Sequence, residues 1–241
     1  MSPDTRQHRG PHPSDRELFA AEKIPTLRTA ILELSWLLSR GYKLASSLKL
    51  VGDRYKLTER QRRAVSCSAC SDAALVRRKD HCVSVEHLSN RDVIIDGFNL
   101  IITIEAALSG APLLVCRDES IRDLSSVHGS YRSVQETERA IALVGQVCDQ
   151  LRLASVLWLL DRPVSNSGRL ASRIAEIAAK HVWPWKVELV FNPDAQIVSS
   201  SSVAITSDSS ILDGVETWTN LKSYLVQHHL NDSWLVDLRS S

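Results

Sequence analysis

The stretch DVIIDGFNL, residues 92–100, decides how this chain is interpreted. Its first half is a short run of β-branched apolar residues, which is typical of a buried strand. The run ends on Asp96, which is followed by Gly97. Asp and Gly together favour a turn, and Asp often precedes the first turn of a helix. The alternative is that Asp96 belongs to a functional site carried by a rigid strand.

Four more short apolar runs follow at intervals. They are LLVC (113–116), SVLWLLD (155–161), KVELVF (186–191) and VAIT (203–206). Helical patterns separate most of them, at residues 99–109, 134–151, 169–181 and 209–226. Strands that alternate with helices predict an α/β fold, in which a central parallel sheet is covered by helices on both faces.

The residues before this region have a different pattern. Residues 1–13 are polar and predict a disordered tail. In residues 26–41, apolar side chains recur at helical spacing, and Thr58 with Gln61 forms a capping-box pattern at the start of another helix. The sequence therefore predicts a small, basic, all-helical domain at residues 14–90 and an α/β domain at residues 91–241.

The charge is divided between these two parts. The 241 residues include 29 Lys and Arg and 28 Asp and Glu, a net charge of +1. Residues 1–91 hold 17 of the basic and 10 of the acidic residues, which leaves 12 and 18 for residues 92–241. These parts carry +7 and −6. A basic part suggests an anionic partner, and an acidic part suggests a bound cation.

The N-terminal residues contain no apolar core typical of a secretion signal, and no apolar run approaches the length of a membrane span. The five cysteines are expected to be free thiols in a reducing compartment, which predicts a cytoplasmic protein. Cys67 and Cys70, followed by His81, Cys82 and His87, could hold zinc, but buried cysteines are the simpler explanation. The oligomeric state stays open, a homodimer included.

Aspartates follow strand after strand in the predicted sheet. Because ligands bind beyond the carboxyl ends of parallel strands, these side chains are expected to gather at one edge. Crowded carboxylates repel one another, and Mg²⁺ or Mn²⁺ prefers such oxygen ligands. Each aspartate alone is equally well explained as a turn former or a helix cap. The residues concerned are Asp96, Asp118, Asp161, Asp194 and Asp208, with Glu138 on an intervening helix.

Two segments resemble PIN-like and NYN-like nuclease domains. VIIDGFNLI (93–101) is similar to their first strand and loop, and NPDAQIVSSSSVAITSDSSIL (192–212) is similar to the closing part of a PIN domain. RGYKLASSLKLVGDRYKLTERQR (40–62) and LLDRPVSNSGRL (159–170) resemble a prokaryotic family that places a helical unit before such a domain. The resemblance covers most of residues 14–226.

The resemblance implies a PIN-like sheet and a metal-dependent nuclease, with RNA as the expected substrate. It implies that Asp96, Glu138, Asp161 and Asp208 are the catalytic metal ligands, with Asp194 as a further ligand. The helix offers both Glu136 and Glu138, and Glu138 fits the motif more closely. Asn99 is implied to orient Asp96 or a water molecule, and Asn166 to touch the substrate.

Two other groups of residues suggest contacts with nucleic acid. In the segment 123–133, His128, Tyr131 and Arg132 could grip a phosphate or stack on a base, although a plain connector is the alternative. In the helical part, a basic surface would attract phosphates with little sequence specificity, although a solvated charged face is the alternative. Its members are Arg54, Lys56, Arg60, Arg62, Arg63, Arg77, Arg78 and Lys79.

Three other functions fit the sequence less well. A non-catalytic RNA or DNA binder would have an inactive PIN-like domain, but the full set of acids argues against this. A phosphatase with an aspartyl nucleophile needs a second Asp two residues after the first, where this chain has Phe98. A dinucleotide-binding domain is disfavoured because no Gly-x-Gly-x-x-Gly motif follows a strand.

Overall fold

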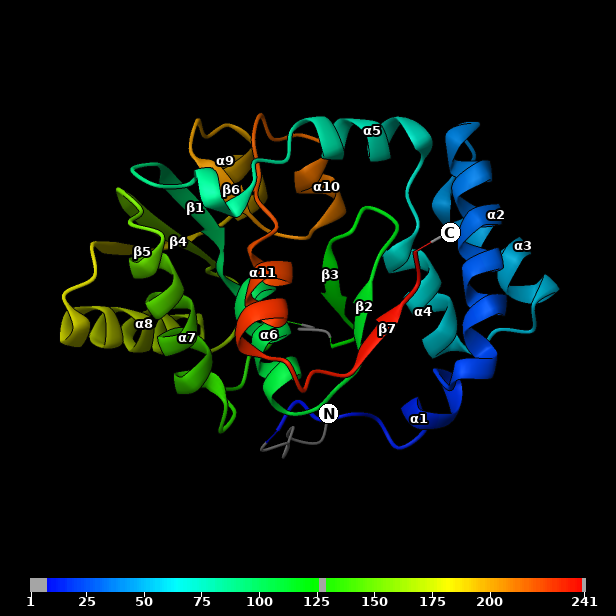
Figure 1. The fold of residues 1–241 in the computed structure, drawn as a ribbon, viewed down its shortest axis with the longest axis horizontal. Coiled ribbons are helices and arrows are strands. Elements are labelled where there is room, and N and C mark those ends of the chain that lie inside the picture. The colour runs from blue at the N-terminus through cyan, green and yellow to red at the C-terminus, as the bar shows by residue number, and fades with distance from the viewer. Residues whose placement is uncertain (1–7, 126–128, 240–241) are drawn as a thin grey trace.

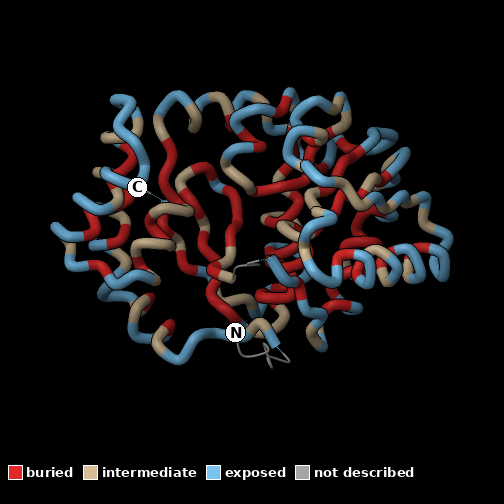
Figure 2. Tube along the Cα trace, turned by 180° about the vertical axis from the view of Figure 1, so that it is seen from behind, coloured by how far each residue is buried: buried red, intermediate tan, exposed pale blue. Residues whose placement is uncertain are grey.

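The computed structural model of the chain describes residues 8–125 and 129–239. These residues form two β-sheets with helices around them, and the smaller sheet lies between the N-terminal helices and the larger sheet (Figure 1). Buried segments gather in the middle of the molecule, and exposed segments surround them (Figure 2). No helix in the described part of the chain is long and apolar enough to cross a membrane.

The larger sheet contains four of the predicted strands. They are β1 (Asp92–Asp96), β4 (Ser155–Asp161), β5 (Trp185–Val190) and β6 (Val203–Ile205), in the order β5-β4-β1-β6. Each neighbouring pair is parallel. The prediction of a parallel sheet flanked by helices is confirmed. The chain runs outward from β1 to β5 and then returns to the other side of β1, so the strand order reverses there.

Strand β1 is buried on both faces, as its unbroken apolar run predicts. Val93 and Ile95 pack into the core on one face, and Ile94 packs into a separate core on the other. The first core includes α6 (Gly97–Leu108), α7 (Thr137–Gln150), α8 (Ser167–His181) and α11 (Leu221–His229). The second includes α9 (Pro193–Val198) and α10 (Ser209–Leu212). The helical pattern predicted at 209–226 is thus two helices.

The smaller sheet corrects one prediction. Its strands are β2 (Leu113–Val115), β3 (Ile121–Asp123) and β7 (Leu235–Asp237), in the order β3-β2-β7. β2 pairs with β3 in the antiparallel direction and with β7 in parallel. The run LLVC was predicted to join the main sheet, and this is wrong. The turn from β2 to β3 is too short for a helical crossover, so the chain forms a hairpin instead.

The N-terminal residues are helical, as predicted. They form α1 (Asp15–Leu18), α2 (Ile24–Ser39), α3 (Leu44–Arg54), α4 (Glu59–Ser68) and α5 (Asp72–Asp80), with single 3₁₀ turns at Ala21–Lys23 and Val85–His87. The capping box of Thr58 and Gln61 is present at the start of α4. The apolar side of α2 packs with Leu114 of β2 and Val236 of β7 in one core. The helices therefore share their core with the smaller sheet.

Close packing between α6 and β4 explains why residue 97 is a glycine. A Cβ atom at this position would lie 2.8 Å from the carbonyl oxygen of Leu159 and 2.6 Å from a methyl carbon of Leu160. The first turn of α6 therefore passes too close to β4 for any side chain. We expect Gly97→Ala to lower the free energy of unfolding by about 1–3 kcal/mol, as overpacking typically does. Urea denaturation would measure this loss.

Gly168 provides the control for this prediction. It lies in the first turn of α8, where an added Cβ would meet its nearest atom at 3.9 Å. Gly168→Ala should be neutral or slightly stabilising because alanine favours the helix. Equal losses at both positions would mean that close packing is not the reason for Gly97.

Candidate functional site

Asp96 is both a helix cap and part of a larger cluster. It precedes the first turn of α6, and its Oδ1 accepts a hydrogen bond from the backbone N–H of Asn99 at 3.5 Å. Its Oδ2 accepts a hydrogen bond from the hydroxyl of Thr206 at 2.9 Å. Thr206 directly follows β6, the strand beside β1. The structural and the functional explanations of Asp96 therefore both remain.

A cavity of about 350 Å³ opens at the carboxyl edge of the larger sheet. Five aspartates from separate segments line it, because β1, β4 and β6 end side by side and α9 and β3 reach the same edge. Ligands of open α/β sheets bind where the strand order reverses, which is at β1 in this sheet. The five residues, which we call the acidic cavity, are Asp96, Asp123, Asp161, Asp194 and Asp208.

The carboxylates of the acidic cavity influence one another. Burial raises the pKa of Asp96 to about 6, and the charge of Asp208 adds to the rise, while the hydroxyl of Thr206 and the charge of Lys222 oppose it. Burial and the charges of Asp208 and Asp161 raise the pKa of Asp194. Ionised carboxylates at this edge therefore repel one another.

Asp161 has a carboxylate oxygen without a hydrogen-bond partner. Its Oδ1 is buried, and no donor in the described part of the chain reaches it. A buried carboxylate oxygen without a partner costs free energy, and native proteins seldom leave one so. Asp161 lines the cavity together with four other aspartates, and carboxylate oxygens are suited to a hard cation.

A buried lysine lies behind Asn99, which lines the cavity. Lys222 is 2% exposed, and its ammonium donates to Asn99 Oδ1 at 2.6 Å, Ser207 Oγ at 2.7 Å and Thr103 Oγ1 at 2.9 Å. Thr103 in turn donates to Asp123 Oδ2 at 2.7 Å. Burial lowers the pKa of Lys222 to about 8, although the charges of Asp123 and Asp96 oppose that change.

Sequence reasoning missed Lys222 and Asp123. Asp123 ends β3, a strand of three residues that shows no clear apolar pattern. Lys222 lies on the buried side of α11 beside Leu225 and Val226. A lysine inside an apolar helical stripe is unusual, because lysine is almost never fully buried without partners. That break in the pattern was the available signal.

The donor set suits Mg²⁺ or Mn²⁺ in kind, since all of its members are carboxylate oxygens. Across residues 8–125 and 129–239, however, no three His, Cys, Asp or Glu side chains are grouped so that they could hold one ion together. Magnesium commonly binds proteins through one or two carboxylates and keeps several water molecules. The cavity fits that mode better than a closed cage of protein ligands.

Glu138 is not part of the acidic cavity, so its prediction as a metal ligand is wrong. It lies on the solvent side of α7, beside the buried stripe of that helix, and pairs with Arg173 of α8. Asp118 also lies elsewhere. It is buried and paired with Arg78 at 2.6 Å and Arg122 at 2.8 Å, so its charge is met by two guanidinium groups.

The segment 123–133 does not present its aromatic side chain to a ligand. Tyr131 is fully buried, and its hydroxyl donates to Glu105 Oε1 at 2.6 Å, so its prediction as a substrate contact is wrong. Asn166 donates to the carbonyl oxygen of Tyr131 at 2.8 Å and thereby fastens this segment to the start of α8. Arg132 is exposed but lines a neighbouring pocket rather than the acidic cavity. His128 lies outside the described residues.

Most arginines of the predicted basic surface form ion pairs or hydrogen bonds within the chain. Arg78 is wrongly predicted as a nucleic-acid contact, because it is 2% exposed and pairs with Asp118 and Asp213. Lys56 and Lys79 are exposed. The remaining arginines are Arg54, paired with Glu33; Arg60, paired with Asp15; Arg62, paired with Asp53; Arg63, donating to the carbonyl oxygen of Ser125; and Arg77, donating to those of Asp213 and Val215.

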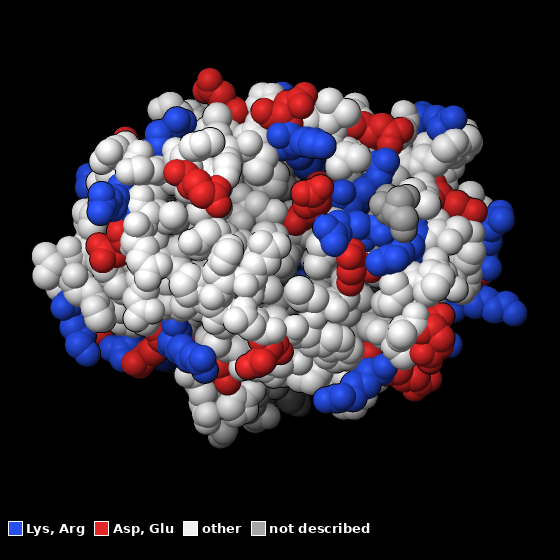
Figure 3. Space-filling model, viewed as in Figure 1, with Lys and Arg blue, Asp and Glu red and all other residues white. Residues whose placement is uncertain are grey.

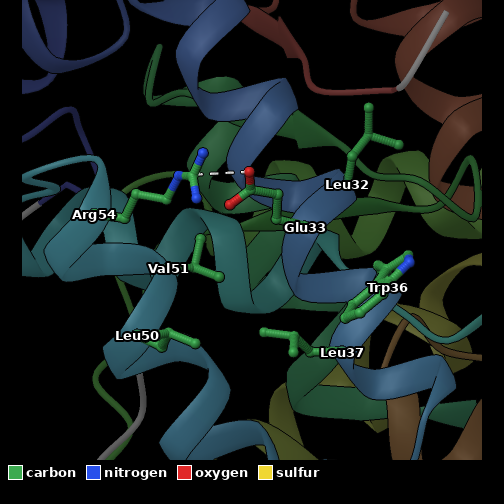
Figure 4. Close-up of a pocket in the computed structure, with 7 residues that line it drawn as sticks. All are labelled: Leu32, Glu33, Trp36, Leu37, Leu50, Val51 and Arg54. Atoms are coloured by element: carbon green, nitrogen blue, oxygen red, sulfur yellow. Dashed lines mark ion pairs between the residues drawn. The ribbon is translucent and has the colours of Figure 1, made fainter.

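Figure 3 shows one patch of Lys and Arg right of centre, with Asp and Glu at its edge. Elsewhere on this face charged groups of both signs are scattered around a broad uncharged region. A groove of about 530 Å³ lies between α2 and α3, where Trp36, Leu50 and Leu32 are exposed and Glu33 pairs with Arg54 at 3.6 Å (Figure 4). The groove is mostly apolar and brings together no set of catalytic groups.

The cysteines give no support to a zinc site. Burial raises the pKa of the Cys67 and Cys70 thiols, and in the described part of the chain no three His, Cys, Asp or Glu side chains are grouped as metal ligands. Cys82 is exposed. The Nδ1 atom of His81 lies 2.6 Å from the carbonyl oxygen of Glu216.

The fold and the cavity define the class: a mixed α/β protein with an acidic cavity at the carboxyl edge of a parallel sheet, joined to N-terminal helices. The chain belongs to the family described as "Domain of unknown function (DUF5616)", which matches residues 85–224. A second family, "Protein of unknown function (DUF434)", matches residues 26–81. The first match spans all five aspartates and Lys222, and the second spans most of α2 through α5.

A relative from Methanocaldococcus jannaschii, "Uncharacterized protein MJ0935", is similar over 180 residues. The two are 31% identical there, and the similar region covers 75% of this chain and 86% of the relative. No solved structure matches the chain.

Proposed function

We propose that this chain is a Mg²⁺- or Mn²⁺-dependent nuclease of the PIN-like kind, and that its substrate is RNA. One observation carries the proposal: five aspartates from separate segments line one cavity, where a buried oxygen of Asp161 has no partner among the described residues. Carboxylates gathered at a strand-order reversal are suited to a metal-assisted reaction on a phosphate group. A bound ion would lower the pKa of a water molecule and offset charge on the phosphate.

The side chains of the cavity have separate roles in this proposal. A cation in the cavity would be held by one or two of the carboxylates and would keep several water molecules. Asp96, fixed by Thr206 and the first turn of α6, faces the same space from the neighbouring strand. Asn99 is held by Lys222 and by the backbone N–H of Ser207 at 2.8 Å, so it cannot turn freely toward a ligand. It keeps the inner wall in one arrangement.

The N-terminal helices adjoin the cavity. Arg63 of α4 donates to the carbonyl oxygen of Ser125 at 2.8 Å, and Ser125 lines the acidic cavity. A strand of RNA that reached the cavity would therefore pass close to the helical part of the chain. Exposed Lys56 and Lys79 remain suited to non-specific contacts with its phosphates.

A non-catalytic binder of RNA or DNA is the second candidate. It is favoured by one finding, that no three ligands in the described part of the chain are grouped around a single point. In that case the cavity would bind nucleic acid without cleaving it. Cleavage assays separate the two candidates directly.

Cleavage of mixed RNA should require Mn²⁺ or Mg²⁺ and stop when EDTA is added. Asp161→Asn should lower the cleavage rate by at least ~10²-fold, because it removes a carboxylate suited to the cation. Asp149→Asn, on the exposed side of α7, should leave the rate unchanged. Gel analysis of labelled RNA measures these rates. Equal cleavage by the wild type and Asp161→Asn would indicate a contaminating nuclease.

A further inference from the structure

Strand β5 forms an open edge of the larger sheet. It pairs with β4 on one side, and no strand in the described part of the chain pairs with its other side. The opposite edge of the sheet, at β6, is covered, because Ala204 exchanges backbone hydrogen bonds with Thr217 and Thr219. β5 lies on the side of the molecule away from the N-terminal helices (Figure 1). An uncovered strand edge is a template for pairing with another chain.

The backbone groups along this edge follow from the way β5 pairs with β4. The carbonyl oxygens of Pro184 and Val190 accept hydrogen bonds from the segment that contains β4, so the even-numbered residues direct their backbone groups toward β4. Because this direction alternates along a strand, the odd-numbered residues direct theirs outward. The outward residues are Trp185, Val187 and Leu189.

The middle of this edge has no hydrogen-bond partner. At one end, the N–H of Trp185 donates to the carbonyl oxygen of Trp183 at 2.8 Å. At the other end, the carbonyl oxygen of Leu189 accepts from Arg162 at 3.1 Å. Among the described residues, nothing pairs with the N–H or the carbonyl oxygen of Val187. The central backbone groups of β5 are therefore free to pair with another strand.

The exposed charges of β5 are complementary to those of a second β5. Lys186 and Glu188 are both exposed, and they lie on the same face of the strand because they are two residues apart. If two copies of β5 pair in the antiparallel direction about a two-fold axis at Val187, Lys186 of each copy lies opposite Glu188 of the other. These are the closely spaced positions without hydrogen bonds, where opposite charges stabilise the pairing. A lysine alone would protect the edge, but here each lysine meets an acid.

Exposed apolar side chains flank the same strand. Val182 precedes β5 and is 88% exposed, and Phe191 follows it and is 74% exposed. Among the described residues, these are the most exposed of the large apolar side chains. Continued past the ends of the strand, the register above places Phe191 opposite Trp183 of the second copy. Pairing of two copies would therefore cover apolar surface as well as the open edge.

We propose that two copies of this chain associate through β5, which joins their larger sheets into one continuous sheet. The N–H and carbonyl groups of Val187 pair with the same groups of the second copy, and the N–H of Leu189 pairs with the carbonyl oxygen of Trp185. The strands of the two copies run in opposite directions, so the two acidic cavities lie at opposite ends of the shared sheet. None of the residues that line the acidic cavity takes part, so the association does not depend on the proposed function.

Sedimentation equilibrium of the full chain tests this proposal, and the wild type should form a dimer. Lys186→Glu and Glu188→Lys should each raise the dimer dissociation constant at least ~10-fold, because each change makes two attractive pairs repulsive. The variant that carries both changes should dimerise like the wild type. An equimolar mixture of the two single variants should form a mixed dimer, in which every acid again faces a base. Lys43→Glu, at the exposed start of α3, should not affect the dimer.

A wild type that remains monomeric at every concentration would overturn the proposal. A dimer that neither single variant weakens would overturn it as well, because another surface would then hold the two copies. The same conclusion follows if the variant with both changes associates as poorly as the single variants do. Circular dichroism of each variant should match the wild type, because both substituted side chains are exposed.

Hydrogen exchange of the wild type provides a readout that needs no variant. The outward N–H groups of Val187 and Leu189 should exchange more slowly as the protein concentration rises, because the second copy then accepts from them. The N–H of Trp185 should change less, since it already donates to Trp183 within the chain. Exchange in β5 that does not depend on concentration, in a sample that sediments as a mixture of monomer and dimer, would place the interface elsewhere.

Discussion

Asp96→Asn should abolish metal-dependent cleavage and, at the same time, stabilise the protein when no metal is present. The two effects have opposite signs because one carboxylate serves both. Removing its charge takes away part of the site, but it also relieves repulsion from Asp208 and the cost of burying an ionised group. Asparagine caps a helix about as well as aspartate, so α6 should keep its first turn.

The pH dependence of this stabilisation follows from the sign of the shift. The pKa of Asp96 is raised to about 6 in the folded chain, so the folded state binds the proton more tightly than the unfolded state. Ionised Asp96 therefore destabilises the fold above about pH 6, and that penalty fades as the pH falls toward the unfolded value. Thermal melts in EDTA should show a higher melting temperature for Asp96→Asn at about pH 8 and little difference at about pH 4.

The control is Asp149→Asn, which removes a charge of the same sign from the exposed side of α7. It should change neither cleavage nor the melting temperature at either pH. If Asp96→Asn lowered the melting temperature at about pH 8, the hydrogen bond from Thr206 and the charge of Lys222 would favour the carboxylate more than the acidic cavity opposes it. Asp96 would then be a structural residue first.

Asp118→Asn should cause the largest loss of stability, about 3–5 kcal/mol, because it leaves two buried guanidinium groups without a full counter-charge. Arg78 and Arg122 both pair with Asp118, and all three side chains are buried. The cluster joins α5 to β3 and to the turn before it, so the N-terminal helices and the smaller sheet depend on it. Urea denaturation at neutral pH would measure the loss.

Acid should remove the same contribution from the wild type. Burial alone would raise the pKa of Asp118, but the charges and hydrogen bonds of Arg122, Ser120 and Arg78 outweigh it and hold the pKa well below its usual range. A depressed folded pKa stabilises the protein above the unfolded pKa, and that stability is lost as the pH falls below it. Asp118→Asn should therefore lose less stability than the wild type on acidification.

Asp213→Asn is the matched control for the buried cluster. Asp213 also pairs with Arg78, at 2.7 Å, but its side chain is 46% exposed. Removing a solvent-screened partner should cost at most about 1 kcal/mol. Similar losses for Asp118→Asn and Asp213→Asn would show that burial of the charge is not what makes Asp118 important.

The main sheet could be predicted because its strands carry their signal locally. The runs that end at Asp96, Asp161 and Ile205 are apolar enough to be buried on both faces, and helices separate them. Parallel pairing then brings their ends to one edge, whichever order the strands take. The smaller sheet is harder to predict from the sequence, because β3 and β7 each have three residues and pair only after distant segments meet.

The site could be predicted only in part, for a related reason. Asp96 and Asp161 end strands, and Asp194 and Asp208 come shortly after strands, so strand direction predicts where they lie. Glu138 comes from the motif that the resemblance implies, and a motif does not tell which side of its helix faces the cavity. The same uncertainty concealed Lys222, which points inward from α11.

The amino-acid sequence by itself determined the alternation of strands and helices and the acids at the strand ends, because both depend on residues close together in the chain. Tertiary structure alone decided which charges meet. Asp118 is joined to Arg78, Glu138 to Arg173, and Lys222 to Asn99 only when separate segments pack together. A charge acts on whatever lies near it in space, so the same carboxylate can stabilise one arrangement of the chain and require a cation in another.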